Sequence, residues 1–184
     1  MENILSTNPR SNRNGLIIVH TGDGKGKTTA AIGTAFRALG WGWKISMVQF
    51  LKGTWDTGEK IFSDSLGDSF HIYPMGSGFT WNTKNRDSDI RDCEKILKFL
   101  EALISKCEDD IIIIDEINVV MGLGYLSPQS VIDVIKKKPK WMTVFLTGRN
   151  APNAIIELAD LVTEMREIKH PFQNGVPAQL GVDF

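Results

Sequence analysis

The sequence has few of the features that mark secreted, membrane-embedded or nucleic-acid-coating proteins. It has 184 residues, two cysteines and a formal net charge of −1 at pH 7. No apolar run approaches the roughly 20 residues of a membrane-spanning helix, and residues 1–14 lack the apolar core of a secretory signal. With a net charge near zero, the chain lacks the excess of positive charge that is typical of proteins binding nucleic acid or anionic membranes. We therefore expect a cytoplasmic protein without nucleic-acid or membrane partners.

The two cysteines, Cys93 and Cys107, indicate neither a disulfide nor a metal site. Both fall on the apolar positions of one predicted helix, and the helical rise between them amounts to roughly 21 Å. That separation is far beyond the span of a disulfide. No metal-ligand spacing is present either. We expect two reduced core residues of a cytosolic protein.

Residues 19–29, Val-His-Thr-Gly-Asp-Gly-Lys-Gly-Lys-Thr-Thr, form the strongest local signal. An apolar run over residues 15–19 leads into these glycines, and an alanine-rich helix is predicted over residues 28–39. This order builds a phosphate cradle, in which backbone N–H groups approach the anion, a lysine reaches the outer phosphates and a hydroxyl faces Mg²⁺. The helix adds its positive N-terminal end. The residues expected at the nucleotide are Gly22, Asp23, Gly24, Lys25, Gly26, Lys27, Thr28 and Thr29.

The cradle departs from the pattern G-x-x-x-x-G-K-[ST] at its first position, where Thr21 replaces glycine. The glycines that do occur make the loop one residue tighter. The alternative interpretation is a glycine-rich turn with a surface lysine. A preceding strand and a following helix favour the cradle, because they are the context that the motif requires.

The rest of the chain alternates predicted strands and helices. Short apolar runs predict strands at residues 15–19, 44–51, 70–73, 111–114, 142–146 and 161–165. A long helix is predicted from a cap at Asp87 or Ser88 through Cys107, a second after Ser127-Pro128, and a short one after Pro152. This alternation predicts an α/β fold, a mainly parallel sheet covered by helices on both faces, in a P-loop NTPase-like (RecA-like) single domain over residues 15–184. Residues 1–14 are expected to be a flexible or partner-docking arm.

Lys136, Lys137 and Lys138 end the helix that Ser127 begins. Three adjacent lysines could contact nucleic acid. We favour a solvated helix end that complements the helix dipole.

Asp115 and Glu116 follow four isoleucines, which indicate a strand covered on both faces. In parallel sheets the carboxyl edge holds the ligands. With Thr28 from the cradle, one of these carboxylates is expected to hold Mg²⁺, while Lys27 neutralises the outer phosphates. Arg149 opens a loop on the same edge and would either clamp phosphate or form an ordinary surface ion pair. We expect His20 to be packed and assign it no role.

These parts indicate nucleotide binding but not the reaction. A small-molecule kinase, a DNA-stimulated ATPase and a nucleotide-gated binding module remain open. The near-zero net charge and the absence of basic loops argue against the ATPase, and residues 63–86 are not rich in arginine as a mobile kinase lid usually is. The loop at residues 76–81, Gly-Ser-Gly-Phe-Thr-Trp, fits none of these classes well. Its paired aromatics indicate a large flat apolar ligand, although core packing is the default interpretation.

Several blocks together resemble one family. They are Thr21 to Ala30, residues 48–53, residues 76–81, Asp115-Glu116, residues 147–152 and the ending Ala-Gln-Leu-Gly-Val-Asp-Phe. In this order, from about residue 15 to the end of the chain, they resemble the P-loop type of ATP:cob(I)alamin (corrinoid) adenosyltransferase. The short cradle together with the aromatic loop is the most specific part of the resemblance.

The resemblance implies that cobalt(I) of a reduced corrinoid attacks the 5′ carbon of ATP and expels triphosphate. It implies catalytic roles for Lys27 and Glu116, Mg²⁺ held by Thr28 with Glu116 or Asp115, and Arg149 at the nucleotide. Phe79 and Trp81 match the family's aromatics that exclude the lower axial ligand of the corrinoid. The substrates would be ATP and the corrinoid, the electron donor a flavoprotein-type reductant, and the assembly a homodimer.

Overall fold

The chain forms a six-stranded parallel sheet. The computed structural model describes residues 10–53, 56–76 and 86–183. The strands lie in the order β3-β2-β4-β5-β1-β6, and every neighbouring pair is parallel. The strands are β1 (Ile17–Thr21), β2 (Ile45–Gln49), β3 (Phe70–Pro74), β4 (Ile111–Asp115), β5 (Thr143–Thr147) and β6 (Leu161–Glu164). The predicted mainly parallel sheet is confirmed.

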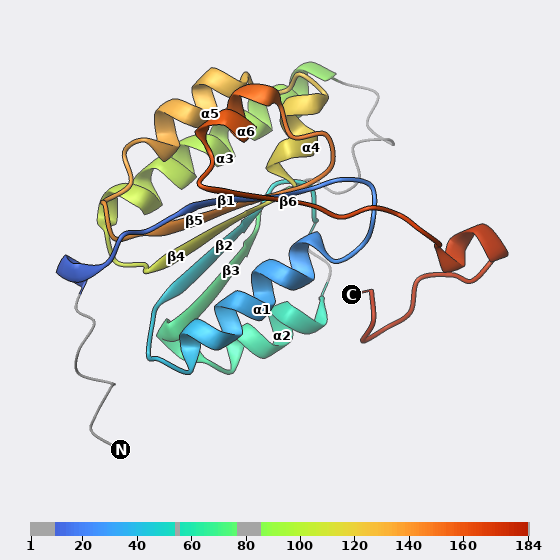
Figure 1. The fold of residues 1–184 in the computed structure, drawn as a ribbon, viewed down its shortest axis with the longest axis horizontal. Coiled ribbons are helices and arrows are strands. Elements are labelled where there is room, and N and C mark those ends of the chain that lie inside the picture. Colours follow the sequence, from blue (N-terminus) through green and yellow to red (C-terminus); the bar gives the residue numbers. More distant parts are fainter. Residues whose placement is uncertain (1–9, 54–55, 77–85, 184) are drawn as a thin grey trace.

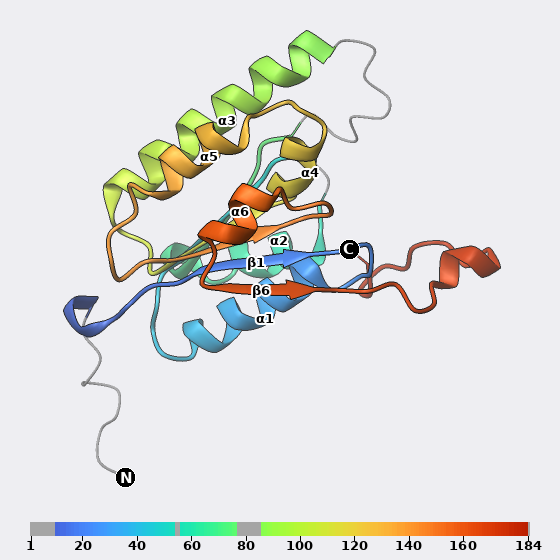
Figure 2. The same cartoon turned by 45° about the horizontal axis from the view of Figure 1, so that its top comes forward.

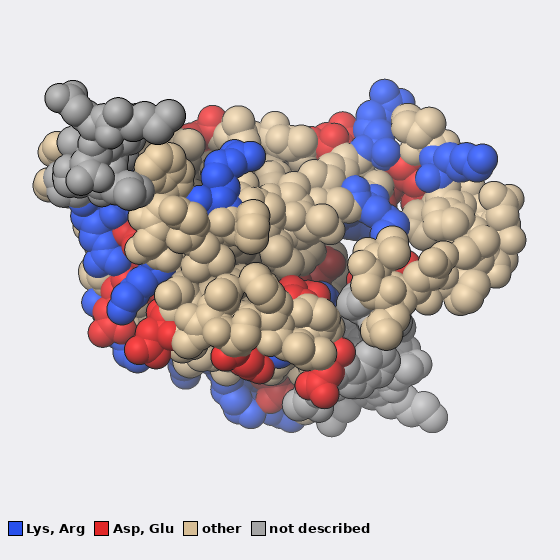
Figure 3. Space-filling model, turned by 90° about the horizontal axis from the view of Figure 1, so that it is seen from below, with Lys and Arg blue, Asp and Glu red and all other residues tan. Residues whose placement is uncertain are grey.

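Helices cover both faces of this sheet, as Figures 1 and 2 show. On one face lie α1 (Lys27–Leu39) and α2 (Gly58–Asp64). On the other lie α3 (Arg86–Lys106), α4 (Ile117–Gly122), α5 (Pro128–Ile135) and α6 (Asn153–Leu158). Seen from the side of α1 and α2, acidic and basic side chains are interspersed around an uncharged area (Figure 3). No helix in the described ranges is long and apolar enough to cross a membrane.

The isoleucines of β4 explain why the sheet needs two covered faces. Ile112 and Ile114 belong to the apolar cluster under α3 and α5, whereas Ile111 and Ile113 belong to the cluster under α1. All four side chains are buried. This strand without polar alternation is thus covered on both faces, as predicted.

At the opposite extreme, β6 is the edge strand beside β1, and all four of its residues are exposed. Leu161 and Val162 are 48% and 39% exposed. Parallel strands are normally covered on both faces. The exposed apolar side chains of β6 thus leave this part of the sheet open to a partner.

The N-terminal segment is fixed at the amino end of the sheet from Arg10 onward. Arg10 and Arg13 bind the Asp110 carboxylate, with nitrogen–oxygen distances of 2.9 and 2.6 Å. Their guanidinium carbons lie 4.2 Å from the Trp141 ring centroid and 4.1 Å from that of Trp43, respectively, a favourable cation–π geometry. The described part of the predicted arm therefore contacts this chain's own domain, while residues 1–9 lie outside the described residues.

Two predictions about the long helix are wrong. Cys107 was expected in the core, but α3 ends at Lys106 and Cys107 is exposed at a φ of 55°. The chain must turn there to enter β4, which rotates the side chain off the apolar face. Cys93 is buried as predicted, and burial raises the pKa of its thiol to about 11. The helix begins at Arg86, so Asp87 and Ser88 lie in its first turn rather than at its cap.

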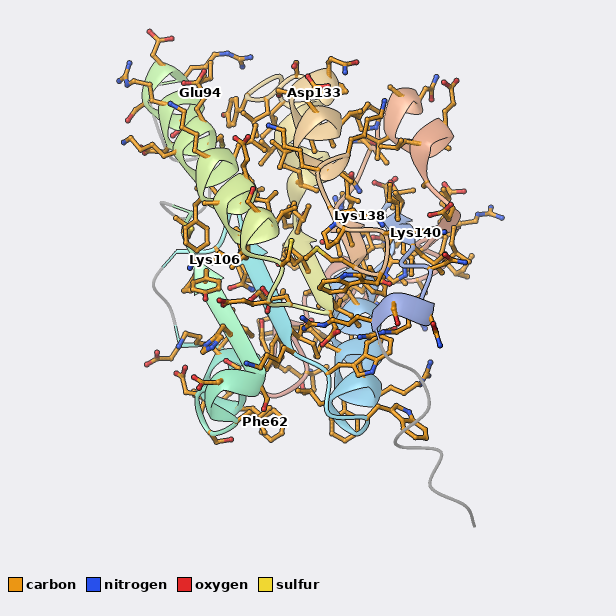
Figure 4. All side chains as sticks on the ribbon, turned by 90° about the vertical axis from the view of Figure 1, so that its left-hand side faces the viewer. Phe62, Glu94, Lys106, Asp133, Lys138 and Lys140 are labelled. Carbon is orange, nitrogen blue, oxygen red and sulfur yellow. The ribbon has the colours of Figure 1, made fainter. Side chains whose placement is uncertain are left out.

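The lysine run is not simply a solvated helix end. The ammonium of Lys138 donates hydrogen bonds to the carbonyl oxygens of Gly15 and Met142, at 3.1 and 2.8 Å. Burial lowers the pKa of Lys138. Lys137 pairs with Glu101 of α3. Lys138 lies at the amino end of the sheet, which faces the viewer in Figure 4. There it ties the chain before β1 to the chain before β5, and the prediction of a solvated Lys138 is wrong.

Candidate functional site

The polar residues predicted from the sequence converge at the carboxyl edge of the sheet. Lys27 and Thr28 begin α1, just after the loop that follows β1. Asp115 ends β4, Glu116 follows it, and Arg149 lies after β5. Because all six strands run parallel, their carboxyl ends meet at one edge. The structure thus brings together residues that are far apart in sequence.

The loop from Thr21 to Thr28, termed the phosphate loop, encloses the ammonium of Lys27. Gly22 and Gly26 adopt φ values of 91° and 104°, which glycine reaches without strain. Lys27 Nζ donates to the carbonyl oxygens of Gly22 and Gly24 at 2.7 and 2.6 Å. Burial is the main cause that lowers the pKa of Lys27. In this state the lysine is held ready in the loop by two neutral acceptors.

Thr21 explains the missing first glycine of the motif. Its side chain is buried, and Oγ1 accepts a hydrogen bond from the backbone N–H of Ala151 at 3.1 Å. A glycine at this position could not make that bond. The threonine therefore joins the phosphate loop to the loop that carries Arg149, which sequence reasoning did not foresee.

The outer side of the phosphate loop is bound by the chain after β6. The N–H of Gly24 donates to the carbonyl oxygen of Met165 at 2.7 Å. Lys25 forms an ion pair with Asp183, and the lysine lowers the pKa of that carboxyl. The Gly24 N–H is consequently directed at protein. Lys25 reaches the C-terminal turn, and Thr29 is exposed in the first turn of α1.

Asp115 is the best-prepared carboxylate of the site. Its Oδ1 accepts hydrogen bonds from the hydroxyls of Thr28 and Thr147, each at 2.7 Å. Its Oδ2 is buried and has no hydrogen-bond partner among the described residues. A carboxylate oxygen beside a threonine hydroxyl at a phosphate loop is a donor set that suits Mg²⁺. Sequence reasoning did not single out Thr147 as a site residue, although it directly follows the strand predicted over residues 142–146 and stands at this edge.

Glu116 is held in an unusual backbone conformation, with a φ of 61°. Its N–H donates to Oγ1 of Thr147 at 3.0 Å, which ties it to the same hydroxyl as Asp115. Burial, followed by the charge of Asp115, raises the pKa of Glu116 to about 7. The positive charges of Lys27, Lys52 and Arg149 act in the opposite direction. A cation bound here would favour the ionised form further.

The raised pKa of Glu116 predicts how the metal-free protein responds to pH. The folded state holds this proton more tightly than the unfolded chain, so its contribution to stability is present below pH 4.5 and is lost as pH rises through about 7. The shift amounts to at most about 3 kcal/mol. Thermal unfolding in EDTA across this range measures it, with Glu116→Gln as the variant that lacks the titration. If the stability of the unsubstituted protein rose with pH relative to Glu116→Gln, the assignment would be wrong.

Arg149 and His20 differ in how far they are available to a ligand. Arg149 Nε lies 4.0 Å from Asp23 Oδ1, and both side chains are more than half exposed, so the pair contributes little stability. The guanidinium remains accessible to an anion at the phosphate loop. His20 is buried, with Nδ1 3.0 Å from the carbonyl oxygen of Lys27 and its ring edge-on to Phe145. It is packed, as predicted.

Phe79 and Trp81 lie outside the described residues, but both flanks of their loop are placed. On one side, the N–H of Gly76 donates to the carbonyl oxygen of Gln49 at 3.2 Å. On the other, Arg86 donates to the carbonyl oxygen of Leu123, after α4, at 2.9 Å. Gln49 is the last residue of β2, and Leu123 is the first residue after α4. Gly76 and Arg86 are therefore each bonded to a carbonyl oxygen of the main domain.

Comparisons with known proteins identify relatives of this chain. Residues 13–184 match the family model described as ATP:corrinoid adenosyltransferase BtuR/CobO/CobP. The corrinoid adenosyltransferase of Escherichia coli (strain K12) is 43% identical over 170 residues, covering 92% of this chain and 86% of the relative. Corrinoid adenosyltransferase CobA of Salmonella typhimurium is 42% identical with the same coverage. The flagellar accessory protein FlaH of Methanocaldococcus jannaschii matches in structure with a TM-score of 0.58, covering 83% of this chain and 71% of its own. At 15% identity it shows the fold alone.

Proposed function

Because this chain belongs to the ATP:corrinoid adenosyltransferase family, we propose that its phosphate loop binds ATP as an adenosyl donor rather than a phosphoryl donor. The activity of the family is transfer of the adenosyl group of ATP to a corrinoid. The observation that carries this proposal is the convergence of Lys27, Thr28, Asp115 and Glu116 at the carboxyl edge of the sheet. Together these residues form a site for the triphosphate end of ATP.

In the proposed reaction the cobalt(I) electron pair attacks the 5′ carbon of ATP. A Co–C bond forms, the C5′–O bond breaks, and the triphosphate leaves with that bond's electron pair. The protein must therefore stabilise charge that builds up on the oxygen of an intact triphosphate. Lys27 suits this task because its ammonium is already desolvated and held by the carbonyls of Gly22 and Gly24. Arg149, exposed beside the loop, would add a second cation.

The donor set at the loop fits Mg²⁺ bound with ATP. Thr28 and Asp115 already share a hydrogen bond, and Asp115 keeps one buried oxygen without a partner among the described residues. We assign Thr28, Asp115 and Glu116 to the ion, directly or through water. When bound, Mg²⁺ would neutralise phosphate charge. The residues themselves orient the triphosphate and keep it away from bulk water.

We assign the corrinoid to the side of the site where the loop of residues 76–81 leaves the sheet. Gly76 is bonded to Gln49, which pairs in register with Asp115, and Arg86 is bonded to Leu123 after α4. In this proposal Phe79 and Trp81 exclude the lower axial ligand of cobalt. Without that donor the acceptor orbital of cobalt(II) lies lower, so reduction to cobalt(I) is easier.

We also propose a homodimer, supplied with electrons by a flavoprotein-type reductant in the cytoplasm. The exposed apolar residues of β6 support a self-association surface, since a parallel strand is normally covered. The N-terminal arm, fixed at Arg10 and Arg13, would start from the amino end of the sheet.

An anaerobic assay with ATP, Mg²⁺ and chemically reduced cobalamin tests the function. We expect the spectrum of the alkylated corrinoid to appear, with one triphosphate released for each Co–C bond formed. Omitting the corrinoid should leave ATP intact. Formation of ADP together with a phosphorylated acceptor would place the protein among small-molecule kinases instead.

A further inference from the structure

Gln49 carries a buried polar group that the proposed function does not yet use. The residue is 1% exposed, and its Nε2 has no hydrogen-bond partner among the described residues. A buried donor without a partner destabilises the fold, so such groups are rare without a ligand or water. Oδ2 of Asp115, itself 0% exposed, is an equally buried acceptor without a partner in the described part of the chain.

The two groups lie on neighbouring strands at the same level. Gln49 ends β2, Asp115 ends β4, and the register pairs one directly with the other. Gln49 lies two residues after Met47, and Asp115 lies two residues after Ile113. Met47 and Ile113 both belong to the apolar cluster under α1. Side chains two apart on a strand point to one face, so Gln49 and Asp115 face the side from which Thr28 already bonds the carboxylate.

The backbone around Gln49 holds its side chain in place. Its carbonyl oxygen accepts hydrogen bonds from the N–H groups of Met75 and Gly76, at 3.1 and 3.2 Å. The next N–H, that of Phe50, donates to the carbonyl oxygen of Asp115 at 3.2 Å. Gln49 is thus fixed between the carboxylate and the start of the aromatic loop. An amide can donate there without adding charge, whereas a third carboxylate would repel Asp115 and Glu116.

We propose that Gln49 is a positioning residue for the magnesium–triphosphate site. Its amide N–H donates to a water molecule that Asp115 Oδ2 also contacts, and this bond orients the carboxylate and the water held by the ion. A buried donor and a buried acceptor on adjacent strands are the partners that one bridging water requires. The inference rests on the Mg²⁺ site of the proposed function.

Gln49→Met tests this role because it removes the amide while nearly preserving volume. Calorimetric titration of the full-length protein with ATP, in EDTA and across a Mg²⁺ series without corrinoid, gives the metal dependence separately from catalysis. We expect a 10–100-fold higher Mg²⁺ requirement, the usual cost of losing a group that orients a metal ligand. ATP affinity in EDTA should stay within about twofold. Gln129→Met makes the same change on α5, away from the site, and should change neither.

A purely structural role would instead lower the thermal stability and weaken ATP binding equally with and without Mg²⁺. That result, or an unchanged Mg²⁺ requirement, overturns the proposal. Gln49→Asn keeps the amide but shortens the side chain by one methylene group. If Gln49→Met does not fold, this variant replaces it in the experiment, and we expect the same increase in the Mg²⁺ requirement. If Mg²⁺ does not strengthen ATP binding to the unsubstituted protein, the proposed metal site itself fails, a result distinguishable from failure of Gln49 alone.

Discussion

Lys27→Met is expected to lower the rate of adenosyl transfer by about 10²–10³-fold, the usual cost of removing one preorganised group that stabilises developing charge. The ammonium of Lys27 is buried at the loop and already oriented by two carbonyls. Methionine fills a similar volume but offers no charge to the departing triphosphate. Single-turnover rates with reduced cobalamin, together with ATP titrations, separate the effect on transfer from the effect on binding.

Lys25→Met is the matched control. Lys25 lies two residues earlier in the same loop, but its side chain is half exposed and pairs with Asp183 rather than entering the cradle. We expect less than about a tenfold effect, because exposed ion pairs contribute little. Equal losses in both variants would show that general positive charge, not the enclosed ammonium, supports the reaction.

Trp81→Ala is expected to abolish most transfer that starts from cobalt(II), while ATP binding is nearly unchanged. If Trp81 keeps the lower axial ligand off cobalt, its removal restores that donor and makes reduction harder. For a one-electron step, a shift of about 120 mV corresponds to a hundredfold change in the equilibrium. Spectroelectrochemical titration of the protein-bound corrinoid measures that shift directly.

Two comparisons sharpen the test of Trp81. Supplying the corrinoid already reduced to cobalt(I) should restore much of the activity of Trp81→Ala, since the difficult step is bypassed. Trp41→Ala, a substitution in the exposed turn after α1, should leave the potential unchanged. A variant that loses ATP affinity as much as transfer would contradict a role for Trp81 at cobalt.

The sheet was predictable because each strand is a short apolar run with a clear physical signature. The four isoleucines of β4 could be buried only between two helical layers, and the two core clusters contain them in alternation. The phosphate loop was predictable from its glycines. Asp115 and Glu116 were placed by the rule that parallel strands present ligands at their carboxyl ends.

The parts that escaped prediction depend on tertiary contacts. Helices α2 and α4, of seven and six residues, are too short to show a helical period in the sequence. Thr147 acquires its role only because β5 lies beside β4 and brings its hydroxyl to Asp115. The pairing of Arg13 with Trp43 and Asp110 likewise joins segments that no local pattern connects.

The ion pair between Lys25 and Asp183 bears on how the protein should be purified and immobilised. The pair holds Asp183 beside the phosphate loop, so a dye or resin coupled to this carboxyl would lie next to the loop. There it would compete with ATP or hold the turn around Asp183 away from Lys25. Arg10, by contrast, is bound by Asp110, which precedes β4 at the amino end of the sheet. Surface couplings therefore belong near Arg10 rather than near Asp183.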